Sequence, residues 1–265
     1  APFSKTGGLA DVAASLPKAL AQRGHNVAIV TPLYKHLDPE AMCLSRRLTP
    51  LEVPLKSKSQ NKVIATVWET RLSEGVTLFF IDYPPFFQRE GLYGYDDQSF
   101  DDNAERFSFF SRALVEFARQ FSVPVDILHC NDWHTALAPV YLRQYYAKEL
   151  NISSVLTVHN VAYQGEFAES EFVSATGLPA KTYLTPAQLK QGNNFNMLKG
   201  GLVNADKVVT VSPTYAKEIT TADGGCGLET LFKKRKADLL GVLNGADYSI
   251  WSPENDLHLS IRYSE

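Results

Sequence analysis

Cysteine is scarce in this sequence. Among 265 residues there are only three, Cys43, Cys130 and Cys226, and no two of them form a CxxC pair. Neither a disulfide framework nor a cysteine metal site can be built from such a set. We therefore expect buried or partly exposed thiols, as in proteins of reducing compartments.

A long apolar run and an excess of positive charge are also missing. No stretch approaches the ~18 consecutive apolar residues that a membrane-spanning helix needs, so we expect no membrane partner. The 26 lysines and arginines are outnumbered by 29 aspartates and glutamates. This balance leaves no basic surplus for sequence-independent nucleic-acid binding. The chain begins at Ala1 without a signal-peptide pattern, and we expect its start to be cut.

The rest of the composition is that of an ordinary globular protein, with 45% hydrophobic and 21% charged residues. The length allows one large domain or two small ones. Short apolar runs alternate with segments of helical periodicity, and no internal repeat or low-complexity linker interrupts them. Such alternation predicts an α/β fold, a mostly parallel sheet with helices on both faces.

The predicted elements follow from periodicity and from Gly and Pro stop signals. Strands are expected over 26–31, 62–70, 76–82, 125–129, 154–159, 207–211 and 238–243. Helices are expected within 4–24, after an opening Gly-Gly turn, and over 103–121, 135–150, 186–203 and 213–220. An aromatic loop, 83–102, precedes the second helix, and residues 160–185 are expected to be irregular.

Ligands of parallel sheets bind beyond the carboxyl ends of the strands. That rule selects the segments 130–134 and 160–165 and Ser212. It also selects the turn 5–9, if a strand precedes Ala1. We expect a binding site where these segments meet.

Lys5, Gly7 and Gly8 stand directly before a predicted helix. Free backbone amides and the partial positive charge at a helix start favour an anion, and glycines let it approach closely. The segment is not a Walker A loop, and a plain glycine turn with a solvated lysine is the alternative.

Polar side chains follow two of the predicted buried strands. Asp132 and His134 flank Trp133 after one strand, and His159 and Asn160 close the next. Asp132 as a helix cap and the histidines as satisfied structural groups are the alternatives. No two histidines have a metal-ligand spacing, so we expect no metal.

The loop 83–102 combines aromatic residues, four aspartates and the segment Gly91-Leu-Tyr-Gly94. Aromatic faces beside carboxylates suit a sugar, and an ordered loop without a ligand is the alternative. No Gly-x-Ser-x-Gly element is present, and the acidic pair of an ordinary glycosidase cannot be singled out.

Five segments together resemble the bacterial glycogen synthase and plant starch synthase family. The likeness covers essentially the whole chain, and the segments occur in the family's order and spacing. They are APFSKTGGLAD (1–11), HCNDWH (129–134), TVHNVAYQG (157–165), TVSPTY (210–215) and LNGADY (243–248) with Trp251.

The resemblance implies the N-terminal half of a GT-B glycosyltransferase, in which two Rossmann-like domains face each other across a cleft. It implies a retaining transfer of glucose from ADP-glucose to the non-reducing end of an α-1,4-glucan, with no metal and no cofactor. The acceptor would be glycogen, amylose or amylopectin. The protein would be located in the cytoplasm of a bacterium or in the plastid stroma of a plant or alga.

The resemblance also carries over individual residues. Lys5 with Gly7 and Gly8 would lie at the donor diphosphate, and Asp11 would order that site. Asp132 and His159 would be catalytic and line the glucosyl pocket. Three further residues would contact the donor: Tyr93, Asn160 and Asn244.

Residues 1–265 would form one domain, since the family's first strand and its second Rossmann-like domain have no counterpart here. We therefore expect the isolated chain to be a poor catalyst. Two alternatives stay open: a non-catalytic α-glucan-binding or regulatory module of the same fold, and another GT-B transferase. A sucrose or trehalose-phosphate synthase relative would be such a transferase, but the segments around Gly7 and Gln164 argue against it.

Overall fold

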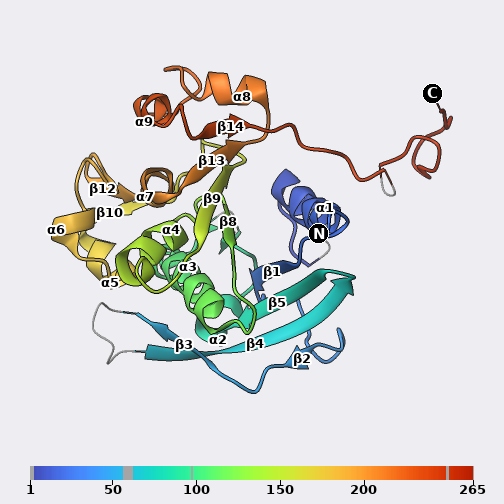
Figure 1. The fold of residues 1–265 in the computed structure, drawn as a ribbon, viewed down its shortest axis with the longest axis horizontal. Coiled ribbons are helices and arrows are strands. Elements are labelled where there is room, and N and C mark those ends of the chain that lie inside the picture. Colours follow the sequence, from blue (N-terminus) through green and yellow to red (C-terminus); the bar gives the residue numbers. More distant parts are fainter. Residues whose placement is uncertain (1–2, 56–61, 97, 249–250, 265) are drawn as a thin grey trace.

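A computed structural model describes residues 3–55, 62–96, 98–248 and 251–264. Ala1 and Pro2 of the first resembling segment lie outside these residues. The strands form two main sheets, with the long helix α3 (Asn103–Gln120) lying between them (Figure 1). In the described part of the chain, no helix is both long and apolar enough to cross a bilayer.

The first main sheet is wholly parallel. It has the order β14-β13-β9-β8, so chain neighbours β8 and β9 are adjacent in space. Its strands are β8 (Ile127–Asn131), β9 (Ser153–Val158), β13 (Lys207–Thr210) and β14 (Leu239–Gly241). All four carboxyl ends therefore meet at one edge, as predicted.

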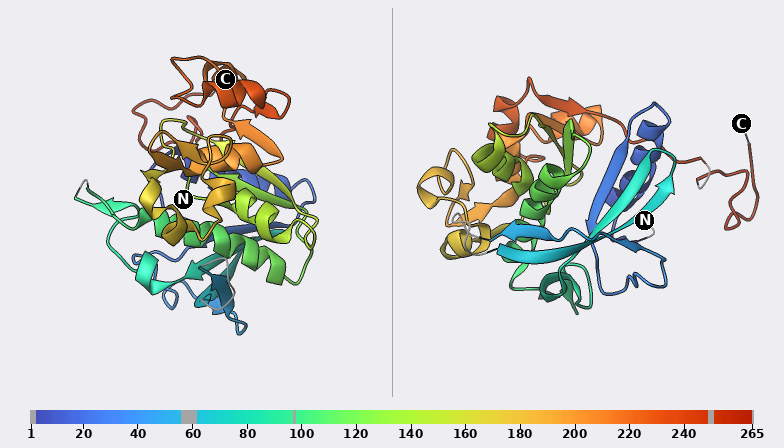
Figure 2. Two further views of the ribbon diagram at one scale, coloured as in Figure 1. Left: turned by 90° about the vertical axis from the view of Figure 1, so that its left-hand side faces the viewer. Right: turned by 60° about the horizontal axis from the view of Figure 1, so that its bottom comes forward.

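The second main sheet is mixed. β1 (Val27–Pro32) runs parallel to β5 (Val76–Asp82), and β5 pairs antiparallel with β4 (Lys62–Ser73). Two short strands, β2 (Ser45–Arg46) and β3 (Leu51–Pro54), also pair antiparallel with β4. Helix α1 (Gly8–Ala21) packs against β1 and β5 (Figure 2). The seven predicted strands are present, and the α/β class is confirmed.

Helix α3 is buried along most of its length, and its buried residues include polar and charged ones such as Arg106, Ser111 and Glu116 beside the apolar ones. It contacts β3 of the mixed sheet and, on its other side, α4 (Leu137–Tyr141) and α5 (Phe172–Thr176). Phe107, Phe110 and Phe117 are among the side chains that join the two sheets in one hydrophobic core. The core thus fixes the site-bearing loops of both sheets against one helix.

The predicted helix over 186–203 is wrong in its first half. Residues 190–196 form the hairpin of β11 (Lys190–Gln191) and β12 (Asn194–Asn196), which also pairs with β10 (Glu166–Ala168). The left-handed Gly192 (φ 59°) makes the turn. Asn196 then caps α7 (Met197–Asn204) by accepting the Lys199 N–H. Periodicity alone did not reveal this turn.

The predicted helix over 135–150 is shorter than expected. Helix α4 continues as a π-helical turn, Leu142–Tyr146, and ends in a turn at 147–149. The remaining elements are short: α2 (Pro84–Phe87), β6 (Gly94–Tyr95), β7 (Gln98–Ser99), a 3₁₀ turn (Glu169–Glu171), α6 (Ala180–Tyr183), α8 (Pro213–Glu218) and α9 (Glu229–Lys234). After β14 the chain leaves the sheets in an extended path (Figure 1).

Candidate active site at the carboxyl edge of the parallel sheet

Asp132 lies directly after β8 and is 8% exposed. Its backbone is left-handed (φ 54°), a conformation that Asp tolerates better than most residues. Oδ1 accepts the backbone N–H groups of His159 (2.7 Å) and Asn160 (3.5 Å), which follow β9. Burial raises the pKa of Asp132 to about 6, although these two hydrogen bonds oppose the shift. The turn thus holds a desolvated carboxylate over the end of the neighbouring strand.

His159 is neutral at pH 7. Burial, with a smaller contribution from His129, lowers the pKa of His159 to about 4. Nε2 lies 3.0 Å from Oδ1 of Asn131. Because an amide oxygen can only accept, the proton is assigned to Nε2 and Nδ1 remains an acceptor. Asn131 therefore sets the tautomer of His159, a role that no sequence signal indicated.

Tyr93 is held in an aromatic stack with His134. Its ring lies 4.7 Å from that of His134, which lies 4.1 Å from Trp133. Burial lowers the pKa of His134 to about 3, so this imidazole acts as a neutral aromatic surface. Burial also raises the pKa of Tyr93, a hydrogen bond with Thr6 opposes the shift, and the charge of Asp132 adds to it. Tyr93 thus connects the turn before α1 with the edge of the parallel sheet.

The predicted anion site lies at the start of α1. Gly7 is the N-cap, and a Cβ on Gly7 or Gly8 would meet nothing within 4 Å. No neighbouring atom therefore crowds the side-chain positions of these two glycines. Lys5 Nζ lies 2.8 Å from Asp11 Oδ1, with both side chains partly exposed. This ion pair places Lys5 beside the first turn of α1, and the ordering role of Asp11 stays a prediction.

Asn160 and Asn244 differ in their surroundings. Oδ1 of Asn160 accepts the Ala162 N–H at 3.0 Å and so shapes the loop after β9. Asn244 is exposed in the segment after β14. An ion pair of 3.8 Å between Lys18 and Asp247 places that segment beside α1. The structure thus brings Asp132, His159 and Asn160 into direct contact, while Asn244 stands apart.

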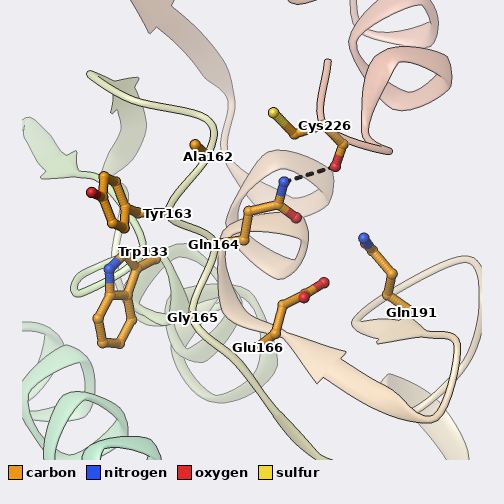
Figure 3. Close-up of a pocket in the computed structure, with 8 residues that line it drawn as sticks. All are labelled: Trp133, Ala162, Tyr163, Gln164, Gly165, Glu166, Gln191 and Cys226. Carbon is orange, nitrogen blue, oxygen red and sulfur yellow. Dashed lines mark hydrogen bonds between the residues drawn. The ribbon is translucent and has the colours of Figure 1, made fainter. Parts of the chain in front are cut away.

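A cavity of about 440 Å³ opens beside Trp133 (Figure 3). Its lining is polar and aromatic and comes from four segments of the chain: Trp133, Ala162, Tyr163, Gln164, Gly165, Glu166, Gln191 and Cys226. Tyr163 is exposed, which leaves its ring free to contact a ligand. Gln191 and Cys226 could not be found from sequence, because folding alone brings them to this loop.

Buried amides fix the wall of the cavity. Gln164 Nε2 donates to the carbonyl oxygens of Val161 (3.0 Å) and Cys226 (2.9 Å), and its Oε1 accepts from Asn196 Nδ2 (2.5 Å). Gly165 is left-handed (φ 62°), and a Cβ there would collide with the Trp133 ring. Only glycine therefore fits at this position without displacing Trp133.

Among the described residues, no group of three or more His, Cys, Asp or Glu side chains could hold a metal ion. The chemistry available at this edge is a buried carboxylate, neutral imidazoles, aromatic faces, amides and a lysine at a helix start. Such a set can bind a sugar through its hydroxyls and a phosphate through Lys5 and the helix amides.

The fold and the geometry define the class of protein: an α/β domain with a site suited to a sugar at the carboxyl ends of its parallel strands. The chain matches the family model described as "Starch synthase catalytic domain" over residues 1–234. It therefore belongs to the starch synthase catalytic domain family, and the resemblance noted above is confirmed.

Curated relatives and a solved structure agree with this membership. The chain is 43% identical to a glycogen synthase from an Anaeromyxobacter species, covering 100% of this chain and 54% of the relative. It is 42% identical to a glycogen synthase from Koribacter versatilis, and the match covers 99% of this chain and 53% of that relative. The catalytic domain of starch synthase IV from Arabidopsis thaliana, bound to ADP and acarbose, superposes with a TM-score of 0.86. That structure is 34% identical, and the match covers 99% of this chain and 53% of that one.

The chain thus spans about half the length of the curated relatives it matches. The expected fold, a Rossmann-like half of a GT-B glycosyltransferase, is confirmed.

Proposed function

We propose that this chain provides one domain of a retaining glucosyltransferase that moves glucose from ADP-glucose to the non-reducing end of an α-1,4-glucan. The observation that carries the proposal is the buried, left-handed Asp132, held by the backbone of His159 and Asn160 at the carboxyl edge. The names of the relatives and the ADP and acarbose bound to the structural neighbour support the donor and acceptor classes.

The leaving group is a diphosphate, which gains negative charge as the glycosidic bond breaks. Lys5 and the backbone amides at the start of α1 stabilise that charge more in the transition state than in the ground state. Asp11 keeps Lys5 in place through their ion pair. Because a cation and helix amides supply the positive charge that stabilises the diphosphate, the transfer needs no metal and no cofactor.

In this proposal the reacting glucose lies against Asp132 and His159. The anomeric carbon becomes positively charged, and the desolvated carboxylate of Asp132 stabilises that charge strongly because water does not screen it. Neutral His159 binds a sugar hydroxyl without adding a competing positive charge. Asn160, Tyr93 and Asn244 complete the donor contacts in this proposal.

The cavity beside Trp133 suits the acceptor glucan. The exposed Tyr163 offers an aromatic face to a sugar ring, while Glu166 and Gln191 offer hydrogen-bonding groups. Glycogen, amylose and amylopectin share the repeating unit that such a cavity would bind.

A second Rossmann-like domain completes the site in this proposal, since the relatives are about twice as long as the chain. It would close over the donor, exclude water and suppress hydrolysis. Residues 1–265 alone would then transfer glucose poorly. We further propose a location in the bacterial cytoplasm, or in the plastid stroma of a plant or alga, where thiols such as Cys130 stay reduced.

The test is a transfer assay with the full-length protein, radiolabelled ADP-glucose and maltoheptaose. The expected product is a maltooligosaccharide one glucose longer, with a new α-linkage at the non-reducing end. UDP-glucose and sucrose- or trehalose-forming acceptors serve as controls. Glucan binding without transfer would instead indicate a non-catalytic module, and transfer only to a small acceptor would indicate another GT-B enzyme.

A further inference from the structure

Arg106 is a fully buried cation on α3, with 0% of its residue surface exposed. In the described part of the chain, no carboxylate forms a salt bridge with it. Instead its guanidinium lies 4.8 Å from the ring centre of Phe100 and 5.3 Å from that of Phe107. Burying such a charge is costly unless every donor is used. The arrangement therefore calls for a reason beyond packing.

The donors of Arg106 reach the aromatic loop 83–102. Nε donates to the Phe86 carbonyl oxygen at 2.8 Å, and Nη2 donates to that of Leu92 at 3.2 Å. Nη1 donates to Oδ1 of Asn103 at 2.6 Å. One rigid guanidinium thus ties both arms of the loop to the first turn of α3.

The same set of bonds fixes the backbone of Tyr93. Leu92 immediately precedes it, and the Tyr93 carbonyl oxygen accepts from Asn103 Nδ2 (2.8 Å) and from the Phe100 N–H (3.0 Å). Arg106 orients Asn103 for this contact, since it occupies the oxygen of the amide and leaves the nitrogen facing Tyr93. The side chain of Tyr93 then enters the stack with His134.

We propose that Arg106 is a positioning residue for the donor site, acting through Leu92 and Asn103 to hold Tyr93 between Thr6 and His134. This inference rests on the proposed role of Tyr93 as a donor contact. Arg106 itself touches no substrate. A lysine would keep the charge but could not bond three oxygens from three segments at once.

The experiment compares Arg106→Lys with Arg112→Lys in the full-length protein. Arg112 is a matched control because it lies on the same helix, is buried and packs on an aromatic ring, 3.9 Å from the Tyr145 centre. Its partner is Glu116, away from the loop. Thermal unfolding, kcat, and the KM values for donor and acceptor are measured for both variants.

The expected result for Arg106→Lys is a donor KM raised roughly tenfold with the acceptor KM within about twofold, the pattern of a displaced donor contact. Arg112→Lys changes neither KM by more than about twofold, even if both variants unfold at lower temperature. Should Arg106→Lys not fold, Asn103→Ala interrupts the same link and is expected to give the same donor-specific rise.

A double-mutant cycle with Tyr93→Ala separates this inference from the proposed function. If Arg106 acts through Tyr93, adding Arg106→Lys to Tyr93→Ala changes the donor KM by less than about twofold. Fully additive effects would overturn the positioning role while leaving Tyr93 as a donor contact. An unchanged donor KM in the single variant Tyr93→Ala would overturn both the positioning role of Arg106 and the donor contact of Tyr93.

Discussion

Asp132 and Asp206 lie at opposite edges of the same four-stranded parallel sheet, and both accept hydrogen bonds from the backbone of β9 or of the residues that follow it. Asp206 precedes β13 and accepts the N–H (2.7 Å) and the hydroxyl (2.8 Å) of Ser154. Burial opposes ionisation there, yet these bonds and the Arg143 charge lower the pKa of Asp206. Asp132, by contrast, has its pKa raised to about 6.

The two aspartates differ in how far neighbouring groups offset the cost of burying their carboxylates. Asp206 is half-exposed, has a cationic neighbour in Arg143 and keeps an ordinary structural role. Asp132 is buried, adopts a left-handed backbone and has only two amide donors, one of them distant. A poorly compensated carboxylate reduces stability, and such groups concentrate at functional sites. This difference supports the proposal that the chemistry takes place at the carboxyl edge, while Asp206 at the amino edge contributes to stability.

The largest expected effect is on transfer. Asp132→Asn keeps the size of the side chain but removes its charge, and we expect kcat to fall roughly 10²–10³-fold. The matched variant Asp206→Asn should leave kcat within about twofold. Both are measured in the full-length protein with ADP-glucose and maltoheptaose. Equal losses in the two variants would remove the functional difference between the edges.

The packing of the carboxyl edge gives the next effect. Gly165→Ala meets both a left-handed backbone and the Trp133 ring, and we expect it to lose about 3 kcal/mol of unfolding free energy. Gly192→Ala is the control, because Gly192 is also left-handed (φ 59°) but a Cβ there has open space. It should lose about 1 kcal/mol. Urea denaturation followed by tryptophan fluorescence measures both, and similar losses would show that the Trp133 contact contributes nothing.

The smallest expected effect is the pH dependence of stability. The raised pKa of Asp132 means that the folded protein binds a proton more tightly than the unfolded chain between pH 3.8 and about 6. Asp132 by itself should therefore lower the unfolding free energy as pH rises through this window, by on the order of 2–3 kcal/mol, while the lowered pKa values of His134 and His159 act in the opposite direction over the same range. The lowered pKa of Asp206 acts oppositely, since its stabilisation is present above pH 3.8 and is lost as pH falls further.

Denaturation curves from pH 3 to 7 separate these two contributions. The unfolding free energy of the wild type minus that of Asp132→Asn should fall as pH rises from 4 to 6, and the same difference for Asp206→Asn should fall as pH drops below 4. A difference for Asp132→Asn that stays constant between pH 4 and 6 would place the proton on another group.

Much of the site could be predicted from sequence, because it follows from strand order. Asp132 and His159 follow two short apolar strands, which end at Asn131 and Val158, and parallel pairing of these strands brings both residues to one edge. In the structure the His159 N–H donates to the Asp132 carboxylate. The helix start at Gly8 was equally local, since it depends on neighbouring residues only.

The parts that were missed depend on contacts between distant segments. The hairpin turn at Gly192 replaced a predicted helix because pairing of β12 with β10 outweighed local periodicity. Asn131 and Arg106 have no motif of their own, and their partners lie far along the chain or in a loop. Such roles arise only from contacts made on folding, and no residue spacing in the sequence indicates them.

Hydrogen–deuterium exchange of the full-length protein, with and without ADP-glucose, can locate the donor site directly. We expect donor-dependent protection of segments 5–11, 91–94, 131–134 and 159–165 at the carboxyl edge. At the amino edge we expect unchanged exchange in segments 152–154 and 204–207. Protection confined to the amino edge, or no protection of either edge at saturating donor, would contradict the assignment of the donor site.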